Sequence, residues 1–374
     1  MSFFQNHADW PLLPLKKIAT LKRGYDLPVT ARNEGKVPIY AANGQNGAHD
    51  EVKIEGPGVV TGRSGTIGKV HYCDQGFWPL NTALYVMNFH GNDPRWVYYM
   101  LSVFKLERFS EGAGVPTLNR NLVHDEMIPL PPLAEQKRIA AILDKADAVR
   151  RKRQQAIQLA DDFLRAVFLE MFGDPLTNPK GWGLKPLGQI SIFENGDRSS
   201  NYPSGNDLVS DGVLFLSTKN IVSDKLNLSS CQYILEEKYT SLSRGKARNG
   251  DLIITLRGTL GSCCIFDCEH EKAFINAQMM IIRAGVEVSN LFLHDLIVSK
   301  AIKGHLKSIG QGAAVPQLTA KQLKELLLPI PPMEMQAKYE VIRRSVLASL
   351  AKMHIASEAG LFNILTRKAF SGQL

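Results

Sequence analysis

The sequence predicts an α+β protein that contains the same unit twice: two strand-rich domains joined by two long helices that form an antiparallel coiled coil. Two observations lead to this fold class. A Pro-rich segment occurs twice, as IPLPPLAEQ at residues 128–136 and as LPIPPMEMQ at residues 328–336. A long run without Pro follows each segment, and such a run favours a helix. We therefore predict a pseudo-two-fold tandem rather than one large core.

Shorter matching segments follow the same order in the two halves. They are WPLLPLKKI at residues 10–18 with WGLKPLGQI at residues 182–190, residues 59–68 with 253–261, residues 80–83 with 275–278, and residues 112–118 with 312–318. Short apolar runs such as residues 58–61 and 251–255 predict strands, and Asp93 followed by Pro94 predicts the start of a helix. The second domain is the longer one, mostly before Gly250, so we expect the domains to share a frame and to present different surfaces.

The two Pro-free runs predict long helices. Residues 133–172 contain neither Gly nor Pro and would form one helix about 60 Å long, whereas the second run is interrupted by Gly360. Apolar residues recur at three- and four-residue spacing, for example at Ile139 and Ile142 in the first run and at Ile342 in the second. A single helix cannot bury such a stripe, so we expect the helices to pair, antiparallel if the symmetry axis crosses them. The alternative is that each helix packs only on its own domain.

The composition is that of an ordinary globular protein with an excess of positive charge. The 374 residues carry a formal net charge of +8, which favours a polyanionic partner, although basic proteins without one are also common. The 5 cysteines are an odd number without framework spacing, which suits a reducing compartment. Because neither a signal peptide nor a membrane span is recognisable, we expect a cytoplasmic protein with no membrane segment.

A Gly-rich loop with an arginine occurs in both halves, as RSGTIGK at residues 63–69 and as RGTLG at residues 257–261. Such a turn lets backbone N–H groups and a hydroxyl approach a phosphate, with the arginine as counter-charge. The candidate contacts are Arg63, Ser64, Thr66, Lys69, Arg257 and Thr259. The alternative is a tight hairpin turn with a solvated arginine. The loop is not a nucleotide-binding P-loop, because its glycine spacing is too long and Val70 stands where Ser or Thr would bind Mg²⁺.

Further candidates for DNA contact are amide and basic residues in loops. Asn and Gln can form paired hydrogen bonds with adenine, and Arg or Lys with guanine. These candidates are Asn43, Gln45, Asn46, Asn119, Arg120, Lys219, Asn220, Arg244, Lys246, Arg248 and Gln317. Turn chemistry alone would also place several of them in loops. A basic run at residues 150–153 lies within the first predicted helix, where a solvated face is the more common explanation.

No catalytic or metal-binding residue is assigned. Cys263, Cys264, Cys268 and His270 invite a zinc interpretation, but adjacent strand residues point to opposite faces and the CxxC spacing is missing. The motifs of serine hydrolases, zinc proteases and dinucleotide-binding domains are absent. So is the Asn/Asp-Pro-Pro-aromatic tetrad of adenine methyltransferases, and the sequence therefore predicts no catalysis by this chain alone.

The repeated segments make the chain resemble the DNA-specificity (S) subunit of type I restriction-modification systems. The resemblance rests on the repeated Pro-Leu/Ile-Pro-Pro-x-x-x-Gln segments, on MFGDP at residues 171–175, on GDL at residues 250–252 and on KAFSGQL at residues 368–374. It covers nearly all of the chain. It implies two target-recognition domains, residues 1–128 and 174–328, and two helical spacers, residues 129–173 and 329–374.

The resemblance also implies partners. Each domain would recognise one half of a bipartite site in double-stranded DNA, and the spacers would measure the gap. Two methyltransferase subunits would dock on the spacers, with Gln136, Ile139, Ile142, Gln336 and Ile342 as candidate contacts, and restriction subunits would join through them. Adenine methylation would belong to these partners, which would also bind S-adenosylmethionine, ATP and Mg²⁺. Gly360 and Met335 depart from the pattern of the first spacer.

The residues alone leave other classes open. One is a duplicated DNA-binding scaffold without restriction partners. A second is a stand-alone nuclease or methyltransferase, which would need a carboxylate–metal or cofactor motif. A third is a scaffold whose domains bind protein, and a steep salt dependence of DNA binding would distinguish it from a DNA-binding subunit.

Overall fold

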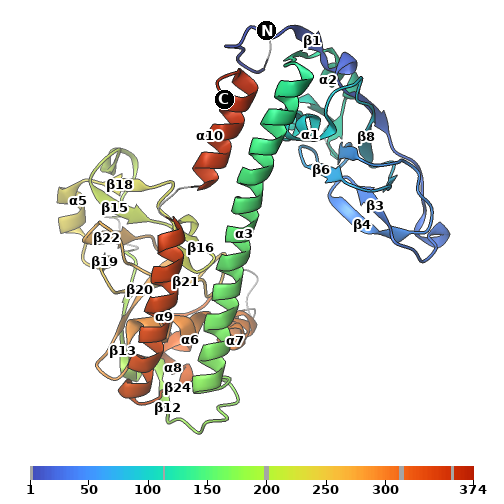
Figure 1. The fold of residues 1–374 in the computed structure, drawn as a ribbon. Helices are drawn as coiled ribbons and strands as arrows, with labels where there is room; N and C mark the ends of the chain where they lie inside the picture. Colours follow the sequence, from blue (N-terminus) through green and yellow to red (C-terminus); the bar gives the residue numbers. More distant parts are fainter. Residues whose placement is uncertain (1–2, 113, 198–201, 311–315, 355–357) are drawn as a thin grey trace. The chain divides into compact units, whose positions relative to one another are not determined.

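The computed structural model describes residues 3–112, 114–197, 202–310, 316–354 and 358–374. The chain forms two compact units, one of Met1–Gln155 with Met353–Leu374 and one of Ala156–Lys352. Each unit contains one strand-rich domain together with parts of the long helices (Figure 1). Residues 113 and 311–315 lie outside the described residues, and all of them except residue 311 belong to the matched segments 112–118 and 312–318.

The first domain is built around an antiparallel sheet with the strand order β2-β8-β5-β6. Its strands are β2 (Thr20–Arg23), β5 (Gly58–Gly62), β6 (Val70–Cys73) and β8 (Ala83–Asn88). A smaller sheet contains β3 (Val37–Ala41), β4 (Gly44–His49) and β7 (Trp78–Pro79), and short pairs join β1 (Leu12–Pro14) to β11 (Met127–Pro129) and β9 (Ser110–Glu111) to β10 (Thr117–Leu118). Helix α1 (Pro94–Val103) packs against β5 and β6, and α2 (Arg120–Asp125) lies near β2. The predicted start of α1 is confirmed, because the Asp93 carboxylate accepts the backbone N–H of Trp96 at 2.9 Å.

The second domain repeats this plan with a larger second sheet. Its first sheet has the order β13-β23-β20-β21, from β13 (Ser191–Asn195), β20 (Leu252–Thr255), β21 (Cys263–Ile265) and β23 (Met279–Ala284). The second sheet has the order β14-β18-β15-β22-β19, from β14 (Leu208–Val209), β15 (Val213–Leu216), β18 (Gln232–Ile234), β19 (Lys246–Arg248) and β22 (Lys272–Ile275). Two short pairs join β12 (Leu184–Pro186) to β24 (Leu327–Pro329) and β16 (Ile221–Val222) to β17 (Lys225–Leu226). The helices are α4 (Leu187–Ile190), α5 (Glu236–Ser241), α6 (Asn290–Val298), α7 (Lys300–Gly310) and α8 (Ala320–Glu325).

The predicted tandem is therefore confirmed at the level of topology. In both domains a short strand near the start pairs with the strand just before the long helix, and the four-stranded sheets have equivalent strand orders. Strands β14 and β19 have no counterpart in the smaller sheet of the first domain, where β4-β3-β7 corresponds to β18-β15-β22. They lie before Gly250, where the sequence places most of the additional residues.

The long helices begin where the Pro-Pro segments predict. Helix α3 spans Leu133–Phe172, and it ends at Gly173, whose φ of 80° is the left-handed conformation that glycine adopts easily. The second run contains α9 (Met333–His354) and α10 (Glu358–Ser371). Gly360, expected to interrupt this run, instead lies within the first turn of α10, where a glycine is readily tolerated. Residues 355–357 lie outside the described residues.

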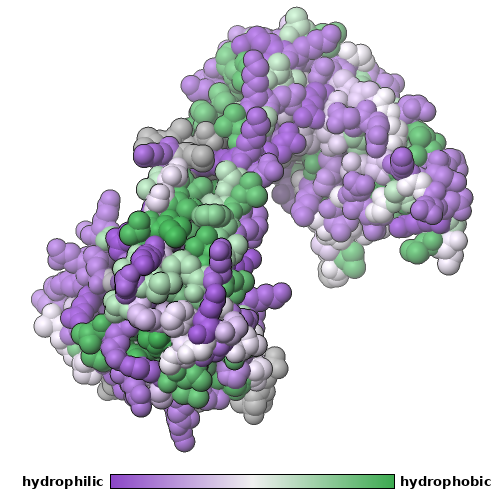
Figure 2. All heavy atoms as spheres, turned by 60° about the horizontal axis from the view of Figure 1, so that its bottom comes forward, coloured by the Kyte–Doolittle hydropathy of each residue, from purple (hydrophilic) through white to green (hydrophobic). Residues whose placement is uncertain are grey.

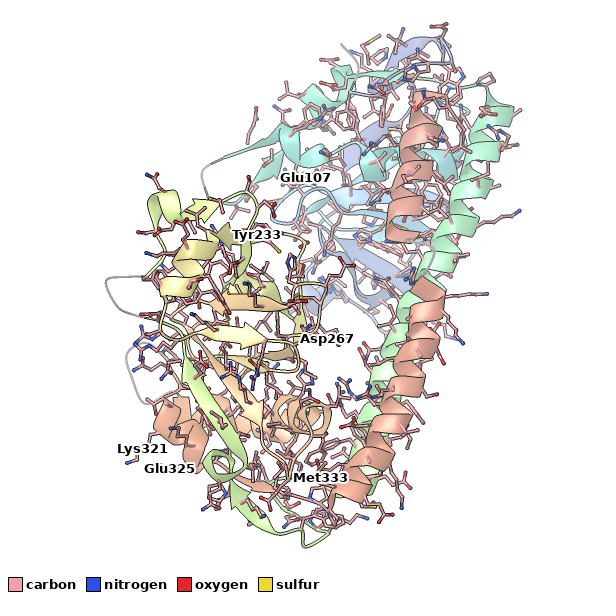
Figure 3. All side chains as sticks on the ribbon, turned by 90° about the vertical axis from the view of Figure 1, so that its left-hand side faces the viewer. Glu107, Tyr233, Asp267, Lys321, Glu325 and Met333 are labelled. Carbon is pink, nitrogen blue, oxygen red and sulfur yellow. The ribbon has the colours of Figure 1, made fainter. Side chains whose placement is uncertain are left out.

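In each unit α3 runs antiparallel to a helix from the end of the chain. In the first unit the Arg138 guanidinium, near the start of α3, donates to the backbone oxygen of Leu374 at 2.8 Å. In the second unit the ring of Phe172, at the end of α3, lies 5.6 Å from the ring of Tyr339, near the start of α9. Figures 1 and 3 show α9 beside α3, and Figure 3 labels Met333 at the start of α9. The predicted antiparallel pairing is confirmed.

The long helices also pack on the domains. Both interpretations of the apolar stripes, pairing of the helices and packing on the domain, are therefore correct. In the first unit Ile139 and Leu143 are buried in one cluster with Trp96 of α1 and Phe370 of α10. In the second unit Phe168 and Phe172 of α3 are buried in one cluster with Phe292 of α6 and Tyr339 of α9. Each stripe is thus covered by a domain helix on one side and by a long helix on the other.

A buried glutamine fixes the start of each long helix to the domain that precedes it. The Gln136 amide nitrogen donates to the backbone oxygen of Pro131 and to the side-chain oxygen of Asn92, at 2.9 Å each. The Gln136 amide oxygen accepts the backbone N–H of Asp93 at 2.9 Å. Gln336 donates to the backbone oxygens of Pro331 and Glu287 at 2.8 and 3.1 Å. Its oxygen accepts the backbone N–H of Ser289 at 2.9 Å. Because Asp93 and Ser289 are the N-caps of α1 and α6, both domains use the same glutamine contact.

A second contact between domain and helix is inverted between the units. In the first unit Asp144 of α3 accepts from Arg95 Nε at 2.6 Å and from the Tyr99 hydroxyl at 2.7 Å, both on α1. In the second unit the carboxylate lies on the domain helix α6. There Asp295 accepts from Arg343 Nε at 2.6 Å and from the Tyr339 hydroxyl at 2.7 Å, both on α9. Both units therefore join a carboxylate to an arginine and a tyrosine, but the carboxylate lies on the long helix in the first unit and on the domain helix in the second.

The buried carboxylate of Asp295 predicts a pH-dependent attachment of α9. Burial alone would raise the pKa of Asp295, but the hydrogen bond with His294 and the charge of Arg343 hold this pKa below its ordinary value. A lowered folded-state pKa means that the stabilisation is present above the ordinary carboxyl pKa and is lost as the pH falls through the lowered value.

We expect Asp295→Ala to lower the free energy of unfolding by about 3 kcal/mol, because it leaves the Arg343 guanidinium buried without its partner. Thermal unfolding at neutral pH measures this loss, and the loss should shrink in acid. Glu334→Ala is the matched control, since it removes an exposed carboxylate that pairs with Lys338 on the same helix and should change little. Equal unfolding temperatures for the two variants would contradict the prediction.

Candidate nucleic-acid interface

The Gly-rich arginine loop of each domain lies against a second segment from much later in the sequence. In the first domain the backbone N–H of Gly65 donates to Pro116 O at 3.1 Å, and that of Leu118 donates to Arg63 O at 2.8 Å. In the second domain the backbone N–H of Leu318 donates to Leu256 O at 2.9 Å. Both domains thus bring together the two segments that the repeat had matched separately.

A pocket of about 380 Å³ lies at this junction in the first domain. Its polar lining consists of Arg23, Arg63, Glu111, Thr117, Asn119 and Arg120. The Nε of Arg63 donates to the backbone oxygen of Asn81 at 3.1 Å, so the arginine is held by the main chain. The Asn119 amide donates to the Glu111 carboxylate at 3.1 Å, while its oxygen caps α2 by accepting from the N–H of Asn121.

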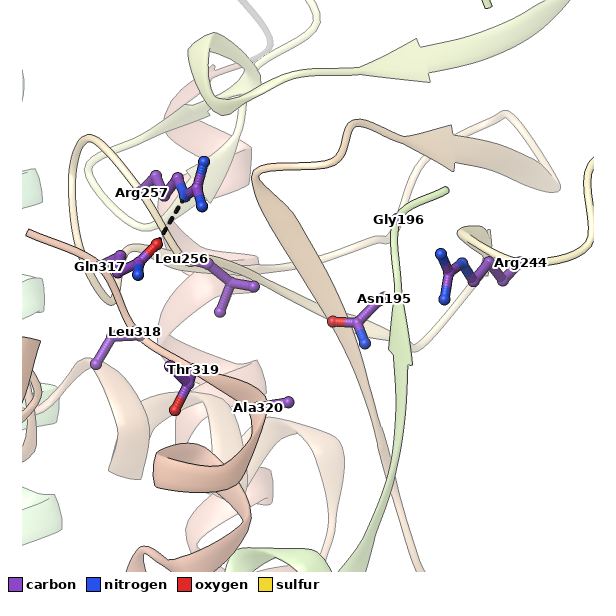
Figure 4. A pocket seen from close by; sticks show the side chains of 9 residues that line it. All are labelled: Asn195, Gly196, Arg244, Leu256, Arg257, Gln317, Leu318, Thr319 and Ala320. Atoms are coloured by element: carbon purple, nitrogen blue, oxygen red, sulfur yellow. Dashed lines mark hydrogen bonds between the residues drawn. The ribbon is translucent and has the colours of Figure 1, made fainter. Parts of the chain in front are cut away.

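A pocket of about 360 Å³ occupies the equivalent place in the second domain (Figure 4). Its polar lining consists of Asn195, Arg244, Arg257, Gln317 and Thr319. The Nε of Arg257 donates to the Gln317 side-chain oxygen at 3.0 Å, which is the dashed contact in Figure 4. Thr319 is the N-cap of α8, as Asn119 is of α2. The two pockets therefore share a frame and differ in their side chains.

The arginines of the two pockets are not neutralised by carboxylates. Within the described parts of the chain, no ion pair is formed by the pocket arginines Arg23, Arg63, Arg120, Arg244 and Arg257. By contrast, Arg283 in the interior pairs with both Glu194 and Asp251. Arginines that line a pocket without carboxylate partners suit an acceptor-rich ligand such as a phosphate or a guanine edge.

The interior network around Arg283 holds the basic loop at residues 244–248 in place. The Glu194 carboxylate accepts the backbone N–H groups of Gly245 and Lys246 at 2.7 and 2.9 Å. Arg283 donates to Glu194 at 2.5 Å and to the backbone oxygen of Lys246 at 2.6 Å. Burial raises the pKa of Glu194, but the Lys246 N–H and the Arg283 charge outweigh it and leave this pKa below its ordinary value. A rigid main chain thus presents the exposed side chains of Arg244 and Arg248.

The other predicted DNA contacts lie outside the pockets. Exposed side chains are those of Asn43, Gln45, Asn46, Lys69, Lys219, Arg248 and Thr259, and half-buried ones are those of Ser64 and Thr66. Asn43, Gln45 and Asn46 lie at the turn between β3 and β4 and at the start of β4. Contact of these residues with DNA stays a prediction.

Asn220 has a structural role instead of the predicted DNA contact, and Lys246 makes contacts within the domain while its DNA contact stays a prediction. Asn220 is only 4% exposed, and its amide donates to the backbone oxygens of Asn227 and Ser230 at 3.1 and 3.0 Å. Its oxygen accepts from Ser217, so the side chain closes a turn and is unavailable to a ligand. The Lys246 ammonium donates to the backbone oxygen of Thr240 at 3.2 Å and lies over the Tyr239 ring. Neither position was distinguishable from an exposed loop by sequence pattern.

The residues predicted to dock partner subunits are of two kinds, some buried and some half-buried. Gln136, Gln336 and Ile139 are 2%, 0% and 0% exposed. They fix the long helices to the domains, so the expectation that they contact partner subunits is corrected. Ile142 and Ile342 are half-buried, and their docking role stays a prediction.

Sequence reasoning missed the pocket residues Arg23, Glu111, Asn195 and Thr319. For Arg23 and Asn195 a signal was present, because each precedes a glycine, Gly24 or Gly196, and these glycines stand equally far after the matched segments at residues 10–18 and 182–190. A Cβ on Gly24 would lie 2.3 Å from Leu80 O, and one on Gly196 would lie 2.3 Å from Asn276 O. The close backbone approach at these glycines marks the edge of each pocket.

No group of three or more His, Cys, Asp and Glu side chains is arranged to hold a metal ion within the described residues. Among the helices that are described, none combines the length and the apolar character needed to cross a membrane.

Comparison with known proteins identifies the family. The family model "Type I restriction modification DNA specificity domain" matches twice, at residues 8–159 and 179–342. The chain belongs to this family, and it is built as a specificity subunit with two recognition domains.

Two curated relatives and one solved structure illustrate the similarity. The Type I restriction enzyme EcoBI specificity subunit of Escherichia coli is 26% identical over 70% of this chain. The MjaVIII specificity subunit of Methanocaldococcus jannaschii is 21% identical over 65% of it. The matched region spans 61% of each of these two subunits. The crystal structure of a type I restriction-modification system S subunit from M. genitalium has the same fold, with a TM-score of 0.66 at 16% identity over 98% of this chain and 97% of that one.

The arginine loop of the first domain predicts a salt effect. We expect Arg63→Ala to weaken DNA binding for all sequences alike and to reduce the slope of log K against log salt by about 1, because one phosphate contact is lost. Filter binding by the assembled complex across salt concentrations measures both quantities. Lys16→Ala removes the same charge from a residue already paired with Asp125, so it should leave the slope unchanged. An unaltered slope for Arg63→Ala would refute the phosphate contact.

Proposed function

We propose that this chain is the DNA-recognising subunit of a type I restriction-modification complex, in which each domain recognises one half of a bipartite duplex site. One observation carries the proposal. Two pockets occupy the same place in two copies of one fold, and their linings differ at Arg23 and Asn195, at Thr117 and Gln317, and at Arg120 and Ala320. A protein that recognises two unlike half-sites needs the same frame with different contact groups.

The proposal assigns the long helices a measuring and docking role. A stiff helix pair fixes the distance between two reading surfaces, as the spacing of half-sites requires. Two methyltransferase subunits would bind along it, and restriction subunits would join through these. Exposed apolar side chains on the helices support such docking in addition to Ile142 and Ile342, namely Val149, Leu159, Phe163, Leu169, Val341, Leu361 and Ile364. Figure 2 shows hydrophobic side chains reaching a mostly hydrophilic surface in patches.

In this proposal the chemistry belongs to the partners. Methyl transfer to adenine requires the base to leave the duplex for a pocket of the methyltransferase. S-adenosylmethionine, ATP and Mg²⁺ would be bound by the partner subunits. This chain contributes the choice of sequence and the geometry of the assembly.

The measuring role predicts a change in the recognised site. Four residues inserted after Gln155 in α3, together with four after Lys352 in α9, lengthen both helices by about 6 Å, a little over one turn. We expect the gap between the half-sites to grow by one or two base pairs, while both half-site sequences stay the same. Long-read methylome sequencing of a host that also expresses the cognate methyltransferase measures the gap.

The control is an insertion of four residues at Gly91, in an exposed turn outside the helices. It should leave the gap unchanged. The same gap in the helix-insertion variant as in the parent chain would defeat the measuring role.

A further inference from the structure

We propose that Arg257 and Gln317 form a base-recognising pair that selects guanine in the half-site of the second domain. This inference rests on the proposed function and goes beyond it, because it assigns one base to one pocket. Arg257 comes from the Gly-rich loop and Gln317 from the segment before α8, and the two lie at the junction shown in Figure 4.

The pair leaves its recognition groups available. Only the Nε of Arg257 is used in the contact with Gln317, at 3.0 Å. Within the described residues, neither side chain makes another hydrogen bond or an ion pair that would occupy the two terminal nitrogens of Arg257 or the amide nitrogen of Gln317. An arginine fixed through Nε directs its two terminal nitrogens together, which is the arrangement that matches the N7 and O6 acceptors of guanine.

The main chain holds the pair in place. Arg257 and Gln317 form an isolated antiparallel bridge, and the neighbouring residues are joined by the hydrogen bond from Leu318 to Leu256 at 2.9 Å. Leu256 and Leu318 are both buried beneath the pocket. Arg257 is exposed and Gln317 is half-buried, so their contact lowers the entropy cost of ordering the arginine.

The lining of this pocket favours an acceptor-rich base edge. Among the described residues it contains Arg244 and the amides of Asn195 and Gln317 but no carboxylate. The pocket of the first domain differs, since it has Thr117 in place of Gln317 and includes the carboxylate of Glu111. A carboxylate accepts from the amino group of cytosine. The two pockets therefore suit different bases.

Base selection by the assembled complex tests the pair. Duplexes randomised in both half-sites are selected by the complex that carries the full chain, and bound sequences are counted. We expect Gln317→Thr, which introduces the residue of the first domain, to reduce the preference for guanine at one position about tenfold or more. The half-site of the first domain should be recognised as before, which also shows that the variant is folded.

Arg257→Ala should lose the same guanine preference, and Lys185→Ala is its control for loss of charge. Lys185 pairs with Glu287 and lies outside the pocket, so its variant should keep every base preference. Weaker binding of Arg257→Ala to all sequences alike, with a smaller salt slope, would show a phosphate contact and overturn the inference. Retained guanine preference in both pocket variants would overturn it too. A parent complex without sequence preference in either half-site would overturn the proposed function itself.

Discussion

The structure depends on how the start of each long helix is fixed to the domain before it. Gln136 and Gln336 do this with equivalent sets of three hydrogen bonds, two from the amide nitrogen and one to the amide oxygen, although one acceptor is the Asn92 side chain in the first domain and the Glu287 backbone in the second. Their oxygens bind the N-cap residues of α1 and α6, so a single side chain orients two helices at once. Because the amides are buried, losing one bond would leave a polar group without a partner, which is costly away from water.

This attachment explains how domains with unlike surfaces can share one frame. The helix start, the short strand pair before it and the four-stranded sheet are equivalent in the two units. The variable parts are the second sheet and the pocket linings. Residues that hold the frame are buried, and residues that differ lie at its edge. Such a division lets the contact groups change while the core packing stays intact.

Much of this arrangement could be predicted because its signals are local or repeated. Gly173 and the Pro-Pro segments bound the helices, and the absence of Gly and Pro between them specifies α3. The repeat then implies the tandem. The pockets could not be predicted, because they join segments more than fifty residues apart, as the bridge between Ser64 and Thr117 does. Asn220 and Gln136 were misassigned for a related reason: an amide can face solvent or close a buried turn, and only its surroundings decide which.

The exchanged positions of acid and base at the two helix attachments have an evolutionary meaning. Placing α1 on α9 would bring Arg95 toward Arg343, and placing α6 on the start of α3 would bring Asp295 toward Asp144. Either misplacement opposes like charges in a poorly hydrated contact. Each domain therefore matches the helix that follows it in the chain. A hybrid built from two copies of the same half would keep both joints matched, whereas a recombinant that joins one domain to the helix of the other half would carry a mismatched joint.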